Sequence, residues 1–244
     1  MISFPTISKG KNTLNISGSL NFTLIVLCCA LALTVGCRQG RNQAAAIDKS
    51  ITVGRHPRTQ TYVYECNDGY GFVARIEGEN AWLFLPNGTI SLPHVRSASG
   101  ARYSDGSITF WSKGEEALLE TDENSRRNCR NNRRKAIWED AKLNGIDFRA
   151  VGNEPGWHLE IRTGDKIVFV GDYGQSRYQF ATPEPKVDQR SRTTTYEVQE
   201  AGHRAVIEID GRSCGDTMSD ETFEATVTVT LDGKKYRGCG RALH

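Results

Sequence analysis

Turn signals recur along most of this chain at short intervals, and that spacing constrains its fold more than any other feature. From Thr61 onward, short runs of aromatic and β-branched residues alternate with turn residues, as at Pro86-Asn87-Gly88 and Ser104-Asp105-Gly106. Such runs suit β-strands, and turns every ~8–12 residues are typical of antiparallel barrels and sandwiches. The pattern therefore predicts an all-β protein.

The strand-like runs fall into two groups, which indicates two domains within the 244 residues. The first group comprises 61–66, 71–76, 81–85, 89–92, 101–103, 108–111 and 117–120. The second comprises 157–161, 166–170, 178–180, 205–209 and 225–231. Between them, residues 136–143 have helical spacing, with Ile137, Ala141 and Trp138 expected on one side.

The N-terminus has the features of a bacterial export signal. Lys9 and Lys11 precede an apolar run over 22–35, which is shorter than the ~20 residues of a membrane span and suits a signal peptide. Gly36-Cys37 at its end resembles a lipobox, in which the cysteine is diacylated and becomes the new N-terminus. An ordinary cleaved signal or a single-span anchor is the alternative.

The lipobox resemblance implies a signal peptide over 1–36 and a lipidated tether over 37–58. Several acyl chains anchor a protein firmly to a lipid bilayer. Arg38, in place of Asp, follows the cysteine. By the same resemblance this implies an outer-membrane lipoprotein that faces the periplasm.

The cysteines support an oxidising compartment. Of seven cysteines, two lie in the apolar run and Cys37 is the lipidation site, which leaves four. Three pairings of these four are possible, and the economical one places a disulfide in each half: Cys66–Cys129 and Cys214–Cys239. A four-cysteine zinc site is the rival, but the sequence has no C-x-x-C pair, so we expect no metal.

The net charge of +2 hides a polarised distribution. Residues 60–122 carry 4 basic and 9 acidic side chains, whereas 126–135 hold six basic residues. Basic runs bind nucleic acid or anionic lipid, or simply remain solvated. Nucleic acid is not expected outside the cytoplasm, so we interpret the run as a solvated linker, with contact to lipid phosphates as the alternative.

One stretch, Ser99 to Gly114, stands out chemically. The sequence has no nucleophile elbow, zincin motif, Walker loop or dinucleotide-binding loop, and nothing in it points to a cofactor. A turn at 104–106 would fold Ser99 toward Lys113, with Trp111 on the same strand face as Lys113. Three interpretations of Ser99 and Lys113 are then open. They form a hydrolase dyad, in which a desolvated lysine deprotonates the serine, or they present a hydroxyl and a cation to a partner protein. The third interpretation is that both are ordinary surface residues.

The combined spacing of several residues distinguishes these alternatives. Ser99-Gly100-x-x-Tyr103 followed by Trp111-x-Lys113-Gly114, with Tyr64-x-Cys66 upstream and Cys129 downstream, resembles the MliC family of membrane-bound inhibitors of c-type lysozyme. The resemblance covers roughly 60–130. It implies an eight-stranded antiparallel barrel closed by a Cys66–Cys129 bridge, with no catalytic group of its own.

The resemblance also implies the site residues. Ser99 and Lys113 are expected to enter the lysozyme cleft and contact its two catalytic carboxyl groups. Gly100 belongs to the same binding motif, and the Tyr103 ring is expected to support the loop. C-type lysozymes are typically basic, so the acidic charge of 60–122 is expected to speed association.

The sequence thus predicts five segments: a signal peptide over 1–36, a tether over 37–58, an inhibitor domain over 59–130, a basic linker with a short helix over 131–146, and a β-rich domain over 147–244. The last resembles an uncharacterised domain of bacterial envelope lipoproteins and has no assignable role. The predicted function is inhibition of c-type lysozyme, which protects peptidoglycan. The alternative is a non-catalytic envelope module that binds a small molecule or a peptidoglycan fragment.

Overall fold

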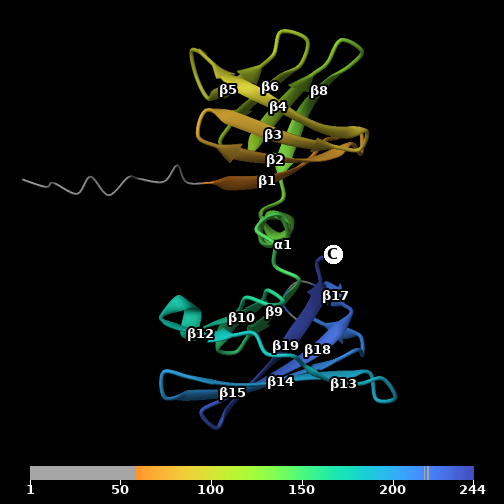
Figure 1. The fold of residues 1–244 in the computed structure, drawn as a ribbon. Helices are drawn as coiled ribbons and strands as arrows, with labels where there is room; N and C mark the ends of the chain where they lie inside the picture. Colours follow the sequence, from red (N-terminus) through yellow and green to blue (C-terminus); the bar gives the residue numbers. More distant parts are fainter. Residues whose placement is uncertain (1–58, 217, 219) are drawn as a thin grey trace, which may run out of the picture. The chain divides into compact units, whose positions relative to one another are not determined.

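A computed structural model describes residues 59–216, 218 and 220–244 of the chain (Figure 1). The expected signal peptide over 1–36, the lipidation site Cys37 and the tether over 37–58 lie outside the described residues. Within the described part, no helix combines the length and the apolar character that crossing a membrane requires. The described fold is nearly all β, with one α-helix, and the predicted fold class is confirmed.

The first domain is a closed barrel of eight antiparallel strands in sequence order. The strands are β1 (Gln60–Glu65), β2 (Gly71–Glu77), β3 (Asn80–Leu85), β4 (Gly88–Val95), β5 (Ala101–Ser104), β6 (Thr109–Lys113), β7 (Glu116–Glu120) and β8 (Ser125–Asn131). Strand β8 closes the barrel by pairing Tyr64 with Asn131 and Glu65 with Arg130. Closure leaves no unpaired edge strand.

The barrel has its own apolar core. Alternate side chains of each strand point inward, and the aromatic residues Tyr64, Phe72, Tyr103 and Phe110 pack together with ring centroids 5.3–6.0 Å apart. A disulfide bond joins Cys66, directly after β1, to Cys129 on β8. The bond therefore ties the two strands that close the barrel.

The basic run is not a free linker. Arg126, Arg127 and Arg130 lie on β8, and the rest of the run enters helix α1 (Arg133–Leu143). Arg126 pairs with Asp68 at 2.5 Å and lies over the Tyr70 ring. The strand-like run at 117–120 is the last one predicted for this domain, and that prediction is wrong because β8 follows it. With β8 included, the barrel carries 7 basic and 10 acidic side chains.

Helix α1 begins at an asparagine cap. The Asn132 side chain accepts a hydrogen bond from the Lys135 amide at 3.2 Å. Trp138 and Ala141 are buried as expected, but Ile137 is 52% exposed, which corrects the predicted buried face. The reason is tertiary: Trp138 packs on Phe223 with ring centroids 5.2 Å apart, which turns the preceding residue outward.

The second domain is built on a nine-stranded antiparallel sheet with the strand order β12-β11-β10-β9-β19-β18-β15-β14-β13. Its strands are β9 (Phe148–Asn153), β10 (Gly156–Ile161), β11 (Lys166–Gly171), β12 (Ser176–Ala181), β13 (Lys186–Asp188), β14 (Thr193–Glu200), β15 (His203–Asp210), β18 (Ala225–Leu231) and β19 (Lys234–Ala242). A 3₁₀ turn (Asp172–Gly174) precedes β12, and β16 (Cys214–Gly215) pairs with β17 (Thr222–Phe223).

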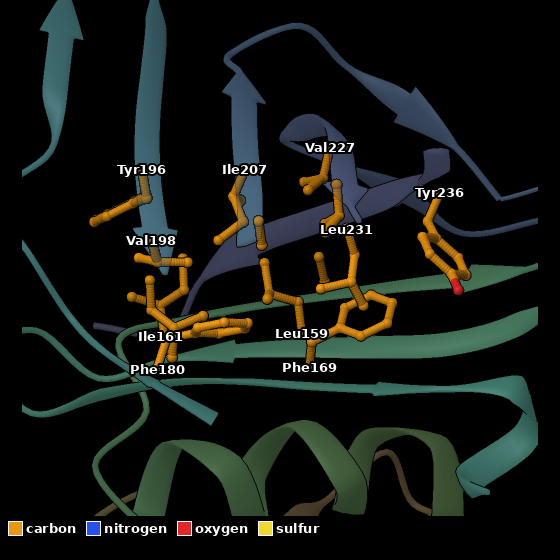
Figure 2. Close-up of a cluster of buried hydrophobic side chains, with 14 of the residues drawn as sticks. Leu159, Ile161, Phe169, Phe180, Tyr196, Val198, Ile207, Val227, Leu231 and Tyr236 are labelled. Atoms are coloured by element: carbon orange, nitrogen blue, oxygen red, sulfur yellow. The ribbon is translucent and has the colours of Figure 1, made fainter. Parts of the chain in front are cut away.

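The sheet curls so that its two halves face one another across a core. Leu159 and Phe169 from β10 and β11 lie opposite Ile207 and Val227 from β15 and β18 (Figure 2). Helix α1 covers part of the other face, where Trp138 belongs to a small cluster with Phe223, Cys239 and Leu243. A second disulfide bond, Cys214–Cys239, joins β16 to β19 beside this cluster.

Candidate functional site

The connectivity of the barrel brings the motif residues to one end. In an antiparallel meander, alternate connections lie at the same end of the strands. The β4–β5 loop over 96–100 and the β6–β7 turn over 114–115 therefore share an end. Ser99 lies in the loop, and Lys113 is the last residue of β6.

Three contacts hold the β4–β5 loop. The Trp111 indole Nε1–H donates to the Ser99 carbonyl at 2.8 Å, and the Ser97 hydroxyl donates to the Gly100 carbonyl at 2.9 Å. In the register of the β5–β6 ladder, Ala101 pairs with Ser112 next to the loop. The loop is therefore fixed by β6, the same strand that presents Lys113.

Gly100 explains how the loop approaches β6 so closely. Its φ is +69°, a left-handed conformation that glycine adopts without strain. A Cβ at this position would lie 2.4 Å from the Ser112 carbonyl oxygen and 3.2 Å from the Lys113 Cβ. The absence of a side chain at Gly100 thus allows the Ser99 loop to lie against the end of β6.

Ser99 and Lys113 are both exposed, and both side chains are available to a partner. Among the residues that the structure describes, neither the Ser99 hydroxyl nor the Lys113 ammonium has a hydrogen-bond or ion-pair partner. Glu115, the carboxylate in the adjacent turn, pairs instead with Arg133 and accepts from Asn131 at 3.0 Å. The hydrogen bond from Arg133 is the main reason that the Glu115 pKa lies below its usual value.

The geometry gives no support to a hydrolase dyad. A lysine that acts as a base must be desolvated, whereas the Lys113 side chain is exposed and no hydrogen bond joins it to Ser99 within the described part of the chain. The described residues also contain no cluster of histidine, cysteine or carboxylate side chains that would hold a metal ion. The arrangement is suited to presenting a hydroxyl and a cation.

Tyr103 differs from the other motif residues because its ring lies inside the barrel. It is 5% exposed, stacks on Phe110 at 6.0 Å and meets the His94 ring edge-on at 5.3 Å. Burial raises the pKa of its hydroxyl above the usual value. Tyr103 therefore does not share an exposed surface with Ser99.

The sequence reasoning missed the role of Trp111. It placed the indole on the face of Lys113, which the alternation of β6 supports, but not its hydrogen bond to the loop. The signal was present in the pattern, because a half-buried tryptophan needs an acceptor for its N–H. Ser97, whose hydroxyl closes the loop onto Gly100, carried no comparable signal.

Comparisons with known proteins find a family that matches part of this chain. Residues 64–127 match the family described as membrane-bound lysozyme-inhibitor of c-type lysozyme, MliC. Most of the barrel is therefore similar to an MliC domain. The match lies within the eight strands and includes all the motif residues from Ser99 to Lys113.

Two relatives of the barrel are named membrane-bound lysozyme inhibitor of C-type lysozyme. The protein from Yersinia enterocolitica is 41% identical over 68 residues, or 28% of this chain and 58% of the relative. The protein from Pseudomonas aeruginosa is 38% identical over 66 residues, or 25% of this chain and 52% of the relative. The chain thus spans little more than half the length of these relatives. No solved structure matches the chain.

Proposed function

We propose that the chain inhibits c-type lysozyme by inserting Ser99 and Lys113 into the active-site cleft of the enzyme. The observation that carries the proposal is that the exposed Ser99 hydroxyl and the exposed Lys113 ammonium are presented at the same end of the barrel. The Trp111 hydrogen bond and the close approach at Gly100 hold the loop of Ser99 against the strand of Lys113. The names of the two relatives support the choice of partner.

The chemistry of the two sites is complementary. Lysozyme cleaves a glycosidic bond with one protonated carboxyl group and one ionised carboxylate. The Ser99 hydroxyl is suited to hydrogen-bond the protonated group, and the Lys113 ammonium is suited to pair with the carboxylate. Occupying the cleft in this way excludes the polysaccharide, so the inhibitor needs no catalytic group.

The electrostatic field of the barrel supports the same partner. Its 10 acidic side chains against 7 basic ones would attract a basic enzyme, and long-range attraction chiefly raises the association rate. Lys113 is the only lysine among residues 59–131. It is therefore a local positive charge within an acidic domain, which fits an acidic cleft in a basic protein.

We infer the remaining organisation from the sequence. A signal peptide over 1–36 would direct export, acylation of Cys37 would anchor the chain in the outer membrane, and the tether over 37–58 would hold the inhibitor domain over 59–130 in the periplasm. The relatives are named as membrane-bound, which supports a membrane location. Palmitate on Cys37 is the corresponding modification to detect by mass spectrometry.

The decisive test replaces both cleft residues. We expect Ser99→Ala with Lys113→Ala to weaken inhibition of a c-type lysozyme by about 100-fold, because losing one partner of a buried charge pair costs ~2–5 kcal/mol. The measurement is the inhibition constant in a cell-wall turbidity assay. The melting temperature should hardly change, because both side chains are exposed and have no partner in the described structure.

The matched control carries the same kinds of substitution at the other end of the barrel. Ser107 lies in the β5–β6 turn, and Arg127 lies near the start of β8 and is 71% exposed. We expect Ser107→Ala with Arg127→Ala to inhibit nearly as well as the unchanged protein. Equal inhibition by the Ser99/Lys113 variant would show that the cleft is not blocked in this way.

A further inference from the structure

The second domain has a cationic groove on the sheet face that points away from its core. Core side chains alternate with outward-facing ones along β9 to β12. The outward-facing residues of this sheet that line the groove are Arg149, His158, Glu160, Lys166, Val168 and Arg177, and Ala136 and Ile137 of α1 form a wall beside them. Residues 59–62 and Asn131 of the barrel complete the lining. The helix lies along this face in Figure 2.

Arg149 is the unusual residue of the groove. It is only 7% exposed, and its Nη1 donates to Glu160, which lies directly opposite it across the β9–β10 pair. Its Nε is buried and has no acceptor in the part of the chain that the structure describes. Burial lowers the pKa of Arg149 to about 10. A buried donor without an acceptor is costly, so a ligand oxygen at this guanidinium would be stabilising.

Other groups leave the groove with a surplus of positive charge. Lys166 and Arg177 have no ion-pair partner among the described residues, whereas Arg162 is paired with Asp165 at 3.1 Å. Burial first, then the positive charges of Arg149 and Arg177, lower the pKa of His158 to about 4. His158 is therefore neutral at pH 7 and offers a hydrogen bond rather than a charge.

The balance of charges indicates how much negative charge the groove accepts. Arg149, Lys166 and Arg177 contribute three positive charges, and the carboxylates of Glu160 and Asp140 offset two of them. Arg133 also lines the groove but is paired with Glu115. One positive charge remains, which suits a monoanion better than a phosphate dianion.

The walls of the groove indicate the rest of the ligand. Ile137 exposes half of its surface beside the groove, and Val168 of β11 also lines it, although only 4% of its surface is exposed. Small-molecule sites combine apolar walls with a few polar groups that fix orientation. We propose that this groove binds a small organic monocarboxylate that carries an apolar group, with the carboxylate at Arg149 and Arg177 and the apolar group against Ile137 and Val168.

N-acetyl-leucine is a suitable probe, because it has one carboxylate and one branched apolar side chain. We expect calorimetric titration of the full chain at pH 7 to give saturable binding of N-acetyl-leucine and none of N-acetyl-leucinamide, which lacks the charge. Lys166→Gln with Arg177→Gln should weaken binding at least about tenfold. These variants leave the partly buried Arg149–Glu160 pair intact, so the fold should persist.

The control removes two positive charges elsewhere on the same domain. Arg190 and Lys235 are exposed and do not line the groove, so Arg190→Gln with Lys235→Gln should bind the probe as the unchanged protein does. Equal binding of acid and amide, or unchanged binding by the Lys166/Arg177 variant, would overturn the proposal. So would tighter binding of inorganic phosphate, or no saturation by the probe at about 10 mM. The lysozyme assay is independent of every one of these outcomes.

Discussion

At the scale of single residues, the candidate site depends most on a residue without a side chain. Two separate requirements exclude a side chain at Gly100. Its backbone has a left-handed conformation, and the Ser112 carbonyl leaves no space for a Cβ atom. Lys113 and Ser99 supply the chemistry, but Gly100 and the Trp111 hydrogen bond set where that chemistry is presented. A binding motif of this kind therefore contains both contact residues and positioning residues.

Gly100→Ala should separate these two requirements when it is compared with Gly69→Ala. Gly69 has a similar φ of +81°, but no atom lies within 4 Å of the position of its Cβ. Gly69→Ala should therefore cost only the conformational strain, about 1 kcal/mol. Gly100→Ala should lower the melting temperature further and weaken lysozyme inhibition, because the loop must move away from β6.

The measurements are thermal unfolding by circular dichroism and the inhibition constant of each variant. A loss of 1 kcal/mol corresponds to roughly 4–8 °C for a domain of this size. Equal melting temperatures and equal inhibition for the two alanine variants would contradict the close approach at Gly100.

At the scale of elements, the β5–β6 hairpin carries the site, and its turn is held by one carboxylate. Asp105 accepts hydrogen bonds from the amides of Ser107 at 2.9 Å and Ile108 at 2.8 Å. These amides, Ile108 first, lower the pKa of Asp105 below its usual 3.8. The ionised form is thus favoured by folding, so its contribution to stability is present above the ordinary pKa and is lost as the pH falls through the lowered value.

Asp105→Asn is the matching test, because asparagine keeps the acceptor oxygen but cannot ionise. We expect the melting temperature of the unchanged protein to exceed that of the variant at pH 6. The difference should shrink as the pH falls below about 4, where the aspartate becomes protonated. A difference that stays constant from pH 6 to pH 2 would show that ionisation of Asp105 does not support the turn.

At the scale of the whole molecule, the barrel has its own apolar core and its own disulfide bond. Its core lies between Tyr64 and Cys129, its last strand ends at Asn131, and both cysteines of its disulfide lie within these limits. A bridge that spans 63 residues of sequence contributes about 4 kcal/mol in the chain-entropy estimate. The candidate site also lies wholly within the barrel.

A fragment over 59–135 should therefore unfold cooperatively and inhibit lysozyme as well as the full chain does. Reduction of its disulfide should lower its melting temperature by at least about 15 °C, given ~4 kcal/mol and ~4–8 °C per kcal/mol. A fragment over 59–123 is the control. It lacks β8, so the barrel cannot close, and we expect no cooperative unfolding. An inactive but folded 59–135 fragment would mean that inhibition needs the second domain.

The sequence by itself determined the β class, the turns and the motif that distinguishes the barrel, because these are local properties. Alternating apolar residues predict a strand, and glycine-containing segments predict a turn, whatever the rest of the chain does. The motif from Ser99 to Lys113 could also be found, because its residue types and spacing are written directly in the chain.

Only the tertiary structure decided which strands pair with one another and which polar residues become buried. Strand β8 has a charged and polar sequence with one buried residue, Cys129, and it belongs to the barrel through backbone pairing, which sequence patterns do not encode. Tyr103 lies inside because it pairs with Phe110 across the hairpin. The groove around Arg149 is lined by residues from six strands and a helix, and so it has no local signature in the sequence. The local sequence therefore determined where most strands and turns form, whereas contacts between residues far apart in the sequence determined which strands pair.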